Sequence, residues 1–134
     1  MREIKFRAWD KNNNEMVEVV SIDYGAYKTK IEYLTVKYKN NETLTEYADN
    51  FELIQYTGLK DKNGKEIYAG DICKAVTKNN NSVIGVVEYR SGYYVIDGKD
   101  EYAVLREWLE NFIYIEKLGN KYENPELLEA DTHD

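Results

Sequence analysis

Short runs of alternating apolar and polar residues cover most of the chain, and this period of two predicts β-strands. In the first run, Ile4, Phe6 and Ala8 alternate with basic residues, and the polar residues 10–14 that follow predict a turn. Further strands are predicted over residues 16–24, 27–39, 43–47, 51–56, 72–77, 83–90, 93–97 and 112–118. The spacing of these runs is typical of a sandwich or a small barrel.

Turn and cap residues separate the runs. The Asn63-Gly64 pair predicts a tight hairpin turn centred on these two residues, because both tolerate the positive φ that such a turn requires. Residues 102–110 combine helical spacing of apolar residues with extended-looking flanks, and we predict a short helical turn there. Asn124 followed by Pro125 predicts the start of a short helix through residue 128.

Composition bears on the compartment of the protein. The 134 residues include 13 tyrosines and a single cysteine, Cys73, which cannot form an internal disulfide and agrees with a reducing compartment. No apolar stretch approaches the roughly 20 residues that a membrane-spanning helix needs. The first ten residues carry charges where an export signal would have an apolar segment. We therefore expect a soluble cytoplasmic protein without membrane contact.

The net charge of −7 is concentrated near the C-terminus. No lysine or arginine follows residue 121, and the acidic residues there are Glu123, Glu126, Glu129, Asp131 and Asp134. The rest of the chain is close to neutral, so its overall charge neither attracts nor excludes nucleic acid.

Residues suited to catalysis or metal binding are scarce. His133, the only histidine, lies beside the last residue, so a nucleophile-histidine pair is not expected. One cysteine and one terminal histidine cannot supply the roughly four ligands of a structural zinc site. Cys73 lies in an apolar strand pattern that favours a buried inert thiol, and Glu107 and Glu110 beside Trp108 are more typical of exposed charges than of an acid pair. We predict no enzyme activity, no catalytic residue, no metal site and no cofactor.

Residues 27–39 mix lysine with tyrosine, as the stacking platforms of single-stranded nucleic acid binders do. The lysines that would contact nucleic acid are Lys28, Lys30, Lys37 and Lys39. Lysines are equally typical of an exposed edge strand, where they prevent pairing with other chains. The near-neutral body of the chain favours this second interpretation.

Two tryptophans are candidates for contact with another protein. Trp9 and Trp108 suit a core or subunit contact better than base stacking. The surplus of aromatic residues over what small β units bury predicts a homo-oligomer.

Three stretches of the sequence resemble one protein family. They are MREIKFRAWD at residues 1–10, QYTGLKDKNGKEIYAGDI at residues 55–72 and GNKYENPELL at residues 119–128. Together they resemble the YopX family of phage and prophage proteins. The resemblance implies a mainly β fold whose later part is an SH3-like small barrel, and it implies no activity and no catalytic residues.

These observations lead to one architecture and three functional hypotheses. We expect a short-stranded β unit over residues 1–55, an SH3-like barrel over residues 56–121, and a short helix with an acidic tail over residues 122–134. The leading hypothesis is a non-enzymatic phage accessory protein that binds a host or phage protein or serves as an oligomeric scaffold. The alternatives are a nucleic-acid binder that uses residues 27–39, and an acidic mimic of DNA.

Overall fold

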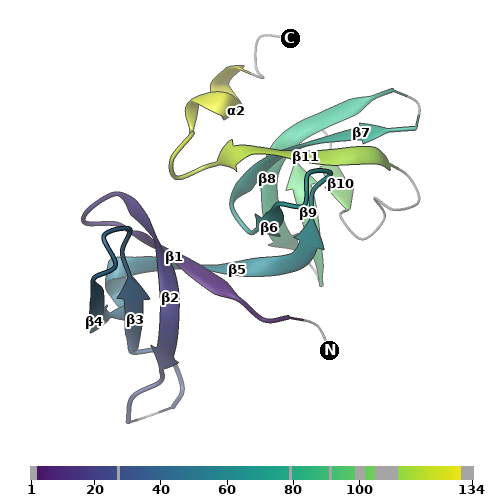
Figure 1. Cartoon of the computed structure of the whole chain (residues 1–134). Helices are drawn as coiled ribbons and strands as arrows, with labels where there is room; N and C mark the ends of the chain where they lie inside the picture. Colours follow the sequence, from purple (N-terminus) through teal and green to yellow (C-terminus); the bar gives the residue numbers. More distant parts are fainter. Residues whose placement is uncertain are drawn as a thin grey trace. The chain divides into compact units, whose positions relative to one another are not determined.

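The computed structural model describes residues 3–26, 28–78, 80–90, 92–98, 102–104 and 112–130. Its described elements are β-strands, one 3-10 turn and one short C-terminal helix (Figure 1), so the prediction of a mainly β fold is confirmed. The chain forms two compact units. The N-terminal unit is Ile4–Gln55, and the C-terminal unit comprises the described residues from Tyr56 onward together with Glu3.

The N-terminal unit is a curled antiparallel sheet. Its strands lie in the order β4-β3-β2-β1-β5. They are β1 (Phe6–Asp10), β2 (Glu15–Asp23), β3 (Tyr33–Lys37), β4 (Thr43–Tyr47) and the first half of β5 (Phe51–Lys60), with the 3-10 turn η1 (Ala48–Asn50) between β4 and β5. Alternate residues of these strands face inward, and the buried core consists of Ala8, Val17, Leu34, Val36 and Phe51.

A buried carboxylate organises one end of this sheet. Asp10 ends β1, and its Oδ1 accepts hydrogen bonds from the backbone N–H groups of Asn12 and Asn13 at 2.9 and 3.1 Å. Its Oδ2 accepts from the Tyr38 hydroxyl at 2.8 Å. These bonds shape the turn between β1 and β2 and attach it to the chain after β3.

The C-terminal unit contains the second sheet. The rest of β5 pairs with β6 (Glu66–Tyr68), and the second sheet has the order β10-β9-β8-β7-β11. Its strands are β7 (Asp71–Thr77), β8 (Ser82–Arg90), β9 (Tyr93–Asp97), β10 (Tyr102–Val104) and β11 (Phe112–Asn120), followed by helix α2 (Glu126–Ala130). Among the described strands β10 and β11 are its edges, so the predicted barrel is not closed. The core includes Ile67, Cys73, Val87, Ile96 and Ile115.

The predicted strand over residues 27–39 is too long. The observed strand β3 begins only at Tyr33, and Lys28 has φ of 56°. The Asp23 side chain ends β2 by accepting a hydrogen bond at 2.7 Å from the N–H of Gly25, which itself has φ of 69°. Two left-handed residues within a few positions interrupt the extended backbone, which local alternation alone did not reveal.

The hairpin after β5 differs from its prediction by one residue. The N–H of Gly64 donates to the Asp61 carbonyl at 3.0 Å, which centres the turn on residues 62 and 63. Gly64 has φ of 82°, whereas Asn63 is not left-handed. This geometry is a type I turn followed by a left-handed glycine, which is a longer hairpin connection than the predicted two-residue turn.

Residues 102–104 also differ from expectation. They form β10, which pairs with β9 through Tyr102 opposite Asp97 and Val104 opposite Val95, so the predicted helical turn is wrong at these positions. Strand pairing overrode the helical spacing of the apolar residues. The remainder of that predicted turn, residues 105–110, lies outside the described residues. In the part of the chain that the structure describes, no helix is long and apolar enough to cross a membrane.

Candidate contact surface

One face of the N-terminal sheet points away from its core and collects aromatic side chains. Ala8, Leu34 and Val36 are buried inward, so their neighbours Trp9, Tyr33 and Thr35 lie on the opposite side. The pairing of strands places further residues beside them, since Met16 lies opposite Trp9 and Tyr47 lies opposite Tyr33. We call this surface the outer face; its residues are Trp9, Met16, Tyr33, Thr35, Thr45 and Tyr47.

A stacked tyrosine pair forms one end of the outer face. The rings of Tyr33 and Tyr47 lie with centroids 5.2 Å apart and planes 28° apart. Tyr47 is 61% exposed. The hydrogen bond to Glu32 and the charge of that carboxylate raise the pKa of Tyr33, so its hydroxyl is neutral at physiological pH. The pair therefore presents a large, neutral and amphipathic surface to solvent, which is typical of protein contact sites.

Hydroxyl groups continue the outer face beside the tyrosines. The side-chain oxygens of Thr35 and Thr45 lie 2.7 Å apart and share a hydrogen bond across β3 and β4. The sequence pattern did not predict the Tyr33–Tyr47 and Thr35–Thr45 pairs, because only the lysines of residues 27–39 were considered as contacts there. The alternation of Thr43, Thr45 and Tyr47 with Leu44 and Glu46 is the signal that could have identified them.

Trp9 lies in the middle of the sheet. Its strand, β1, pairs with β2 on one side and β5 on the other, and Trp9 stands between Met16 and Glu52. The side chain is half-buried, which is intermediate between the core and the contact roles predicted for it. Trp108, the second predicted contact, lies outside the described residues.

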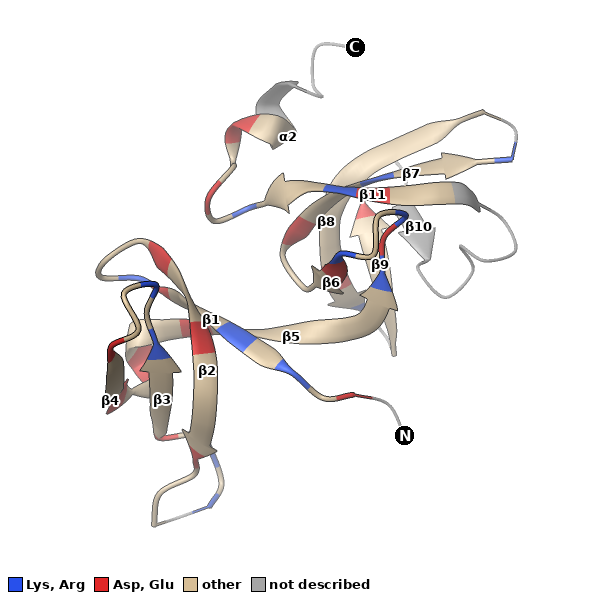
Figure 2. Ribbon diagram, in the orientation of Figure 1, with Lys and Arg blue, Asp and Glu red and all other residues tan. Residues whose placement is uncertain are grey.

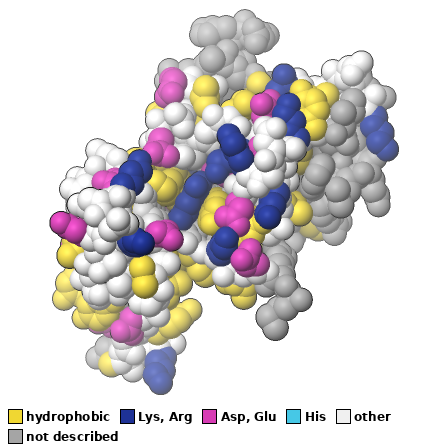
Figure 3. Space-filling view, in the orientation of Figure 1, with side chains coloured by type: hydrophobic (Ala, Val, Ile, Leu, Met, Phe, Trp, Pro, Cys, Tyr) yellow, Lys and Arg dark blue, Asp and Glu magenta, His cyan; other side chains and the backbone are white. Residues whose placement is uncertain are grey.

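The four lysines of residues 27–39 do not share one strand. Only Lys37 lies in β3; Lys28 and Lys30 precede that strand and Lys39 follows it. Figure 2 shows basic residues in the loop between β2 and β3 and at the end of β3. Strand β3 lies between β2 and β4, so the interpretation of this segment as an edge strand is also wrong. On the face shown in Figure 3, acidic side chains lie among the basic ones.

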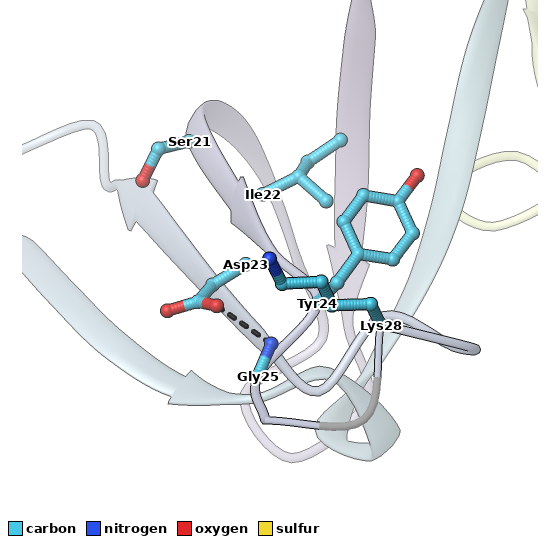
Figure 4. Close-up of a pocket in the computed structure, with 6 residues that line it drawn as sticks. All are labelled: Ser21, Ile22, Asp23, Tyr24, Gly25 and Lys28. Atoms are coloured by element: carbon cyan, nitrogen blue, oxygen red, sulfur yellow. Dashed lines mark hydrogen bonds between the residues drawn. The ribbon is translucent and has the colours of Figure 1, made fainter.

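The loop after β2 borders an open hollow of about 510 Å³. Figure 4 shows its lining residues, with the Asp23 carboxylate bonded to the N–H of Gly25 and the Lys28 side chain beside Tyr24. Among the described residues, no group of three or more His, Cys, Asp or Glu side chains could hold a metal ion. The polar side chains that line the hollow are those of Ser21, Asp23, Tyr24 and Lys28.

The C-terminal unit holds a buried polar cluster. Asp71 is fully buried and accepts a hydrogen bond from the N–H of Tyr68 at 2.7 Å, and the Nζ atom of Lys117 lies 3.1 Å from the same carboxylate oxygen. Asp61 accepts from the backbone N–H groups of Asn63, Lys65 and Lys117, each at 2.9 Å. These partners are mostly backbone groups, so the carboxylates position the hairpin and β11.

The single cysteine is also part of the core. Cys73 lies on β7 and is 0% exposed. Burial, together with the negative charge of Asp71, raises the pKa of its thiol to about 12. A thiol with this environment is protonated and inert at neutral pH, as predicted from its apolar surroundings.

Comparison with known proteins identifies one family over most of the chain. The family model described as YopX protein matches residues 5–129. The crystal structure of protein EF1440 from Enterococcus faecalis is 26% identical, covers 96% of this chain and 99% of its own, and has a TM-score of 0.66. That of protein yopX from Bacillus subtilis is 24% identical over 95% and 98% of the two chains, with a TM-score of 0.59. No curated protein matches.

Proposed function

Because this chain belongs to the YopX family, we propose that it is a non-enzymatic accessory protein of a phage or prophage that binds another protein in the host cytoplasm. The outer face of the N-terminal sheet is the contact surface. The observation that carries the proposal is the stacking of half-buried Tyr33 on exposed Tyr47, on the same face as Trp9.

The chemistry of the outer face supports protein contact. Aromatic residues and methionine are enriched in the centres of protein interfaces, and tyrosine combines apolar area with a hydroxyl group at small entropic cost. The acidic residues Glu52 and Asp23 lie directly opposite Trp9 and Tyr33 on neighbouring strands, and the basic residues Arg7 and Lys37 lie two residues from Trp9 and Thr35 on the same side of the sheet. Charges of both signs therefore border the aromatic residues, which suits a protein surface of mixed charge better than a phosphate backbone.

The experiment is affinity capture from host lysate at two salt concentrations, with three variants. Trp9→Ala removes the central ring, and Thr35→Lys places a charge on the outer face without removing a packed ring. Tyr89→Ser is the matched control, because Tyr89 is 62% exposed on β8 of the C-terminal unit. Each variant is first compared with the parent protein by circular dichroism and thermal melting.

We expect one discrete protein to be retained at high salt by the parent chain and by Tyr89→Ser. Folded Trp9→Ala and Thr35→Lys should lose it. Equal retention by all variants would place the contact elsewhere and contradict the proposal. Tight binding of DNA or RNA that weakens steeply between about 50 and 200 mM salt would favour a nucleic-acid binder instead.

A further inference from the structure

Strand β4 presents an open edge. It is the last strand in the order of its sheet, and Thr43, Thr45 and Tyr47 are exposed. The hydrogen-bonding phase of the β3–β4 hairpin follows from its two ends, where the N–H of Tyr38 donates to the Glu42 carbonyl at 2.9 Å and that of Ala48 to the Glu32 carbonyl at 2.8 Å.

This phase decides which backbone groups point outward. In an antiparallel ladder, residues alternate between those bonded to the partner strand and those turned away from it. Residues 42, 44, 46 and 48 are bonded to the β3 side, so the N–H and C=O groups of Thr43, Thr45 and Tyr47 point to the open edge. Within the described part of the chain, no backbone group pairs with them on that side.

Glu46 is the only side chain of β4 of a kind that protects a sheet edge. The sequence of β4 is TLTEY, which contains neither the lysine nor the proline that commonly blocks edge pairing. Threonine and tyrosine favour extended backbone, and Glu46 is the only charged residue in the strand. A strand of this kind is suited to adding another strand beside it.

We propose that the added strand is β4 of a second copy, in an antiparallel two-fold pairing centred on Thr45. Thr45 then faces Thr45 of the second copy, and Thr43 faces Tyr47 of the second copy on both sides of the centre. Each facing pair exchanges both of its outward N–H and C=O groups, as hydrogen-bonded pairs of an antiparallel ladder do. This inference uses the backbone edge of β4, whereas the partner proposed above binds side chains of the outer face, which include Thr45 and Tyr47 of the same strand; the inference does not depend on that partner.

The strand is self-complementary in this register. The facing residues on the outer side are neutral, with tyrosine beside threonine and threonine beside threonine, which are favourable cross-strand pairs. On the inner side Glu46 faces Leu44 of the second copy, so no like charges meet.

The two neighbouring two-fold registers of the β4 pairing are less favourable. A shift toward Tyr47 sets Glu46 against Glu46 of the second copy, and like charges directly opposite are destabilising. A shift the other way sets Tyr47 against Asn41, whose φ of 72° prevents it from continuing a strand. The Thr45-centred register is therefore the one that uses all three outward residues.

The proposed contact cannot extend beyond a dimer, and it buries little surface. A two-fold contact uses the same edge of both copies, so pairing stops at a dimer. A strand of 5 residues buries less surface than the roughly 1,200 Å² of stable complexes, so dimerisation is weak and depends on protein concentration.

Single cysteines test the register directly. In a hydrogen-bonded antiparallel pair the Cα atoms are about 5.5 Å apart, which is within the range that a disulfide spans. Thr45→Cys should therefore form a covalent dimer under mild oxidation, with twice the 15.7 kDa mass of the chain. Thr43→Cys and Tyr47→Cys alone should not, but a mixture of the two should. The buried native Cys73 does not interfere.

Charge substitutions supply an independent test by light scattering at submillimolar concentration. Thr45→Lys and Thr45→Glu should each be monomeric, and mixing them should restore a dimer because opposite charges then face each other. Tyr89→Lys, on an exposed position of β8, is the control and should dimerise like the parent chain.

A parent chain that stays monomeric at this concentration would overturn the proposal. Cross-linking of Thr45→Cys no faster than that of Tyr89→Cys would overturn it as well. Neither result affects capture of another protein through Trp9, so the two proposals fail separately.

Discussion

The Nζ atom of Lys117 lies 3.1 Å from the Oδ2 atom of Asp71, a carboxylate with no exposed surface. The same nitrogen donates a hydrogen bond to the carbonyl of Glu66 at 3.3 Å. Lys117 therefore neutralises a buried charge and at the same time connects β11 to the first residue of β6 and the first residue of β7.

Removing this lysine should be costly. Lys117→Met keeps the length of the side chain but removes the positive charge beside the buried Asp71 carboxylate, and we expect the free energy of unfolding in urea to fall by about 3 kcal/mol. Lys62→Met is the control, because Lys62 pairs with Glu116 at 3.7 Å with side chains 38% and 34% exposed. Its loss should be about 0.5 kcal/mol. Equal losses would contradict a special role for the buried pair.

The hydrogen bond between Tyr38 and Asp10 should contribute measurably to stability. Tyr38→Phe removes the hydroxyl and leaves the buried carboxylate with one partner fewer, and we expect a loss of ~2 kcal/mol at neutral pH. Equilibrium unfolding in urea measures it. A loss close to zero would show that Asn12 and Asn13 satisfy Asp10 on their own.

This contribution should also depend on pH. Burial raises the pKa of Tyr38, and the hydrogen bond to Asp10 and its charge raise it further, to about 12. The stabilisation is therefore complete below the unfolded-state pKa of about 10 and is lost as the pH rises through about 12. Unfolding measured across this range should show the difference between the parent and Tyr38→Phe shrinking; a constant difference would contradict the assignment.

Acid should destabilise the protein by protonating Asp10, the carboxylate that is hydrogen-bonded to Tyr38. Burial raises the pKa of Asp10, but the hydrogen bonds from Tyr38, Asn13 and Asn12 outweigh it, so the pKa lies below 3.8. The stabilisation is present above that unfolded value and is lost as the pH falls through the depressed folded value. Asp10→Asn should therefore reduce the acid sensitivity of unfolding below pH ~4.

Two glycines should respond differently to the same substitution. Gly64 and Gly70 have similar φ values of 82° and 86°, so alanine at either position adopts a strained left-handed backbone. At Gly64 an added Cβ meets nothing within 4 Å, whereas at Gly70 it comes within 2.9 Å of the Tyr122 ring. We expect thermal and urea unfolding to show losses of about 1 kcal/mol for Gly64→Ala and about 2 kcal/mol for Gly70→Ala, where the Tyr122 side chain must also shift. A larger loss for Gly64→Ala than for Gly70→Ala would contradict the steric contact between the added Cβ at residue 70 and Tyr122.

The thiol of Cys73 should be unreactive in the folded protein. Its pKa of about 12 leaves almost no thiolate at pH 8, and its side chain is fully buried. A thiol-specific reagent should label it only after denaturation. Rapid labelling of the native chain would show that this part of the core opens readily.

Local alternation predicted the strands best where turn residues bracket them. The runs predicted over residues 43–47 and 93–97 coincide with β4 and β9, because each is flanked by a turn or a capping segment. Residues 102–104 were mistaken for a helical turn because the partner that decides their conformation, β9, is supplied by tertiary structure.

The candidate surface was predictable only in part. Trp9 was identified by residue type, but its place between Met16 and Glu52 depends on the order of strands, which alternation does not specify. The same order makes β4 the edge and β3 an interior strand, so the lysine-rich segment was assigned the edge role that belongs to its neighbour. Tyr33 and Tyr47 lie side by side because of the register in which β3 pairs with β4, and the local sequence pattern does not determine that register.

The bond from the N–H of Lys117 to Asp61 joins residues 56 positions apart, and β11 completes the second sheet from the far end of the chain. On the ribosome, β7 is synthesised before β11. Until β11 follows, β7 lacks its partner strand on one side and the core around Cys73 lacks Ile115. We therefore expect the single thiol to be accessible to oxidants, and the edge of β7 to misassembly, chiefly before β11 is synthesised.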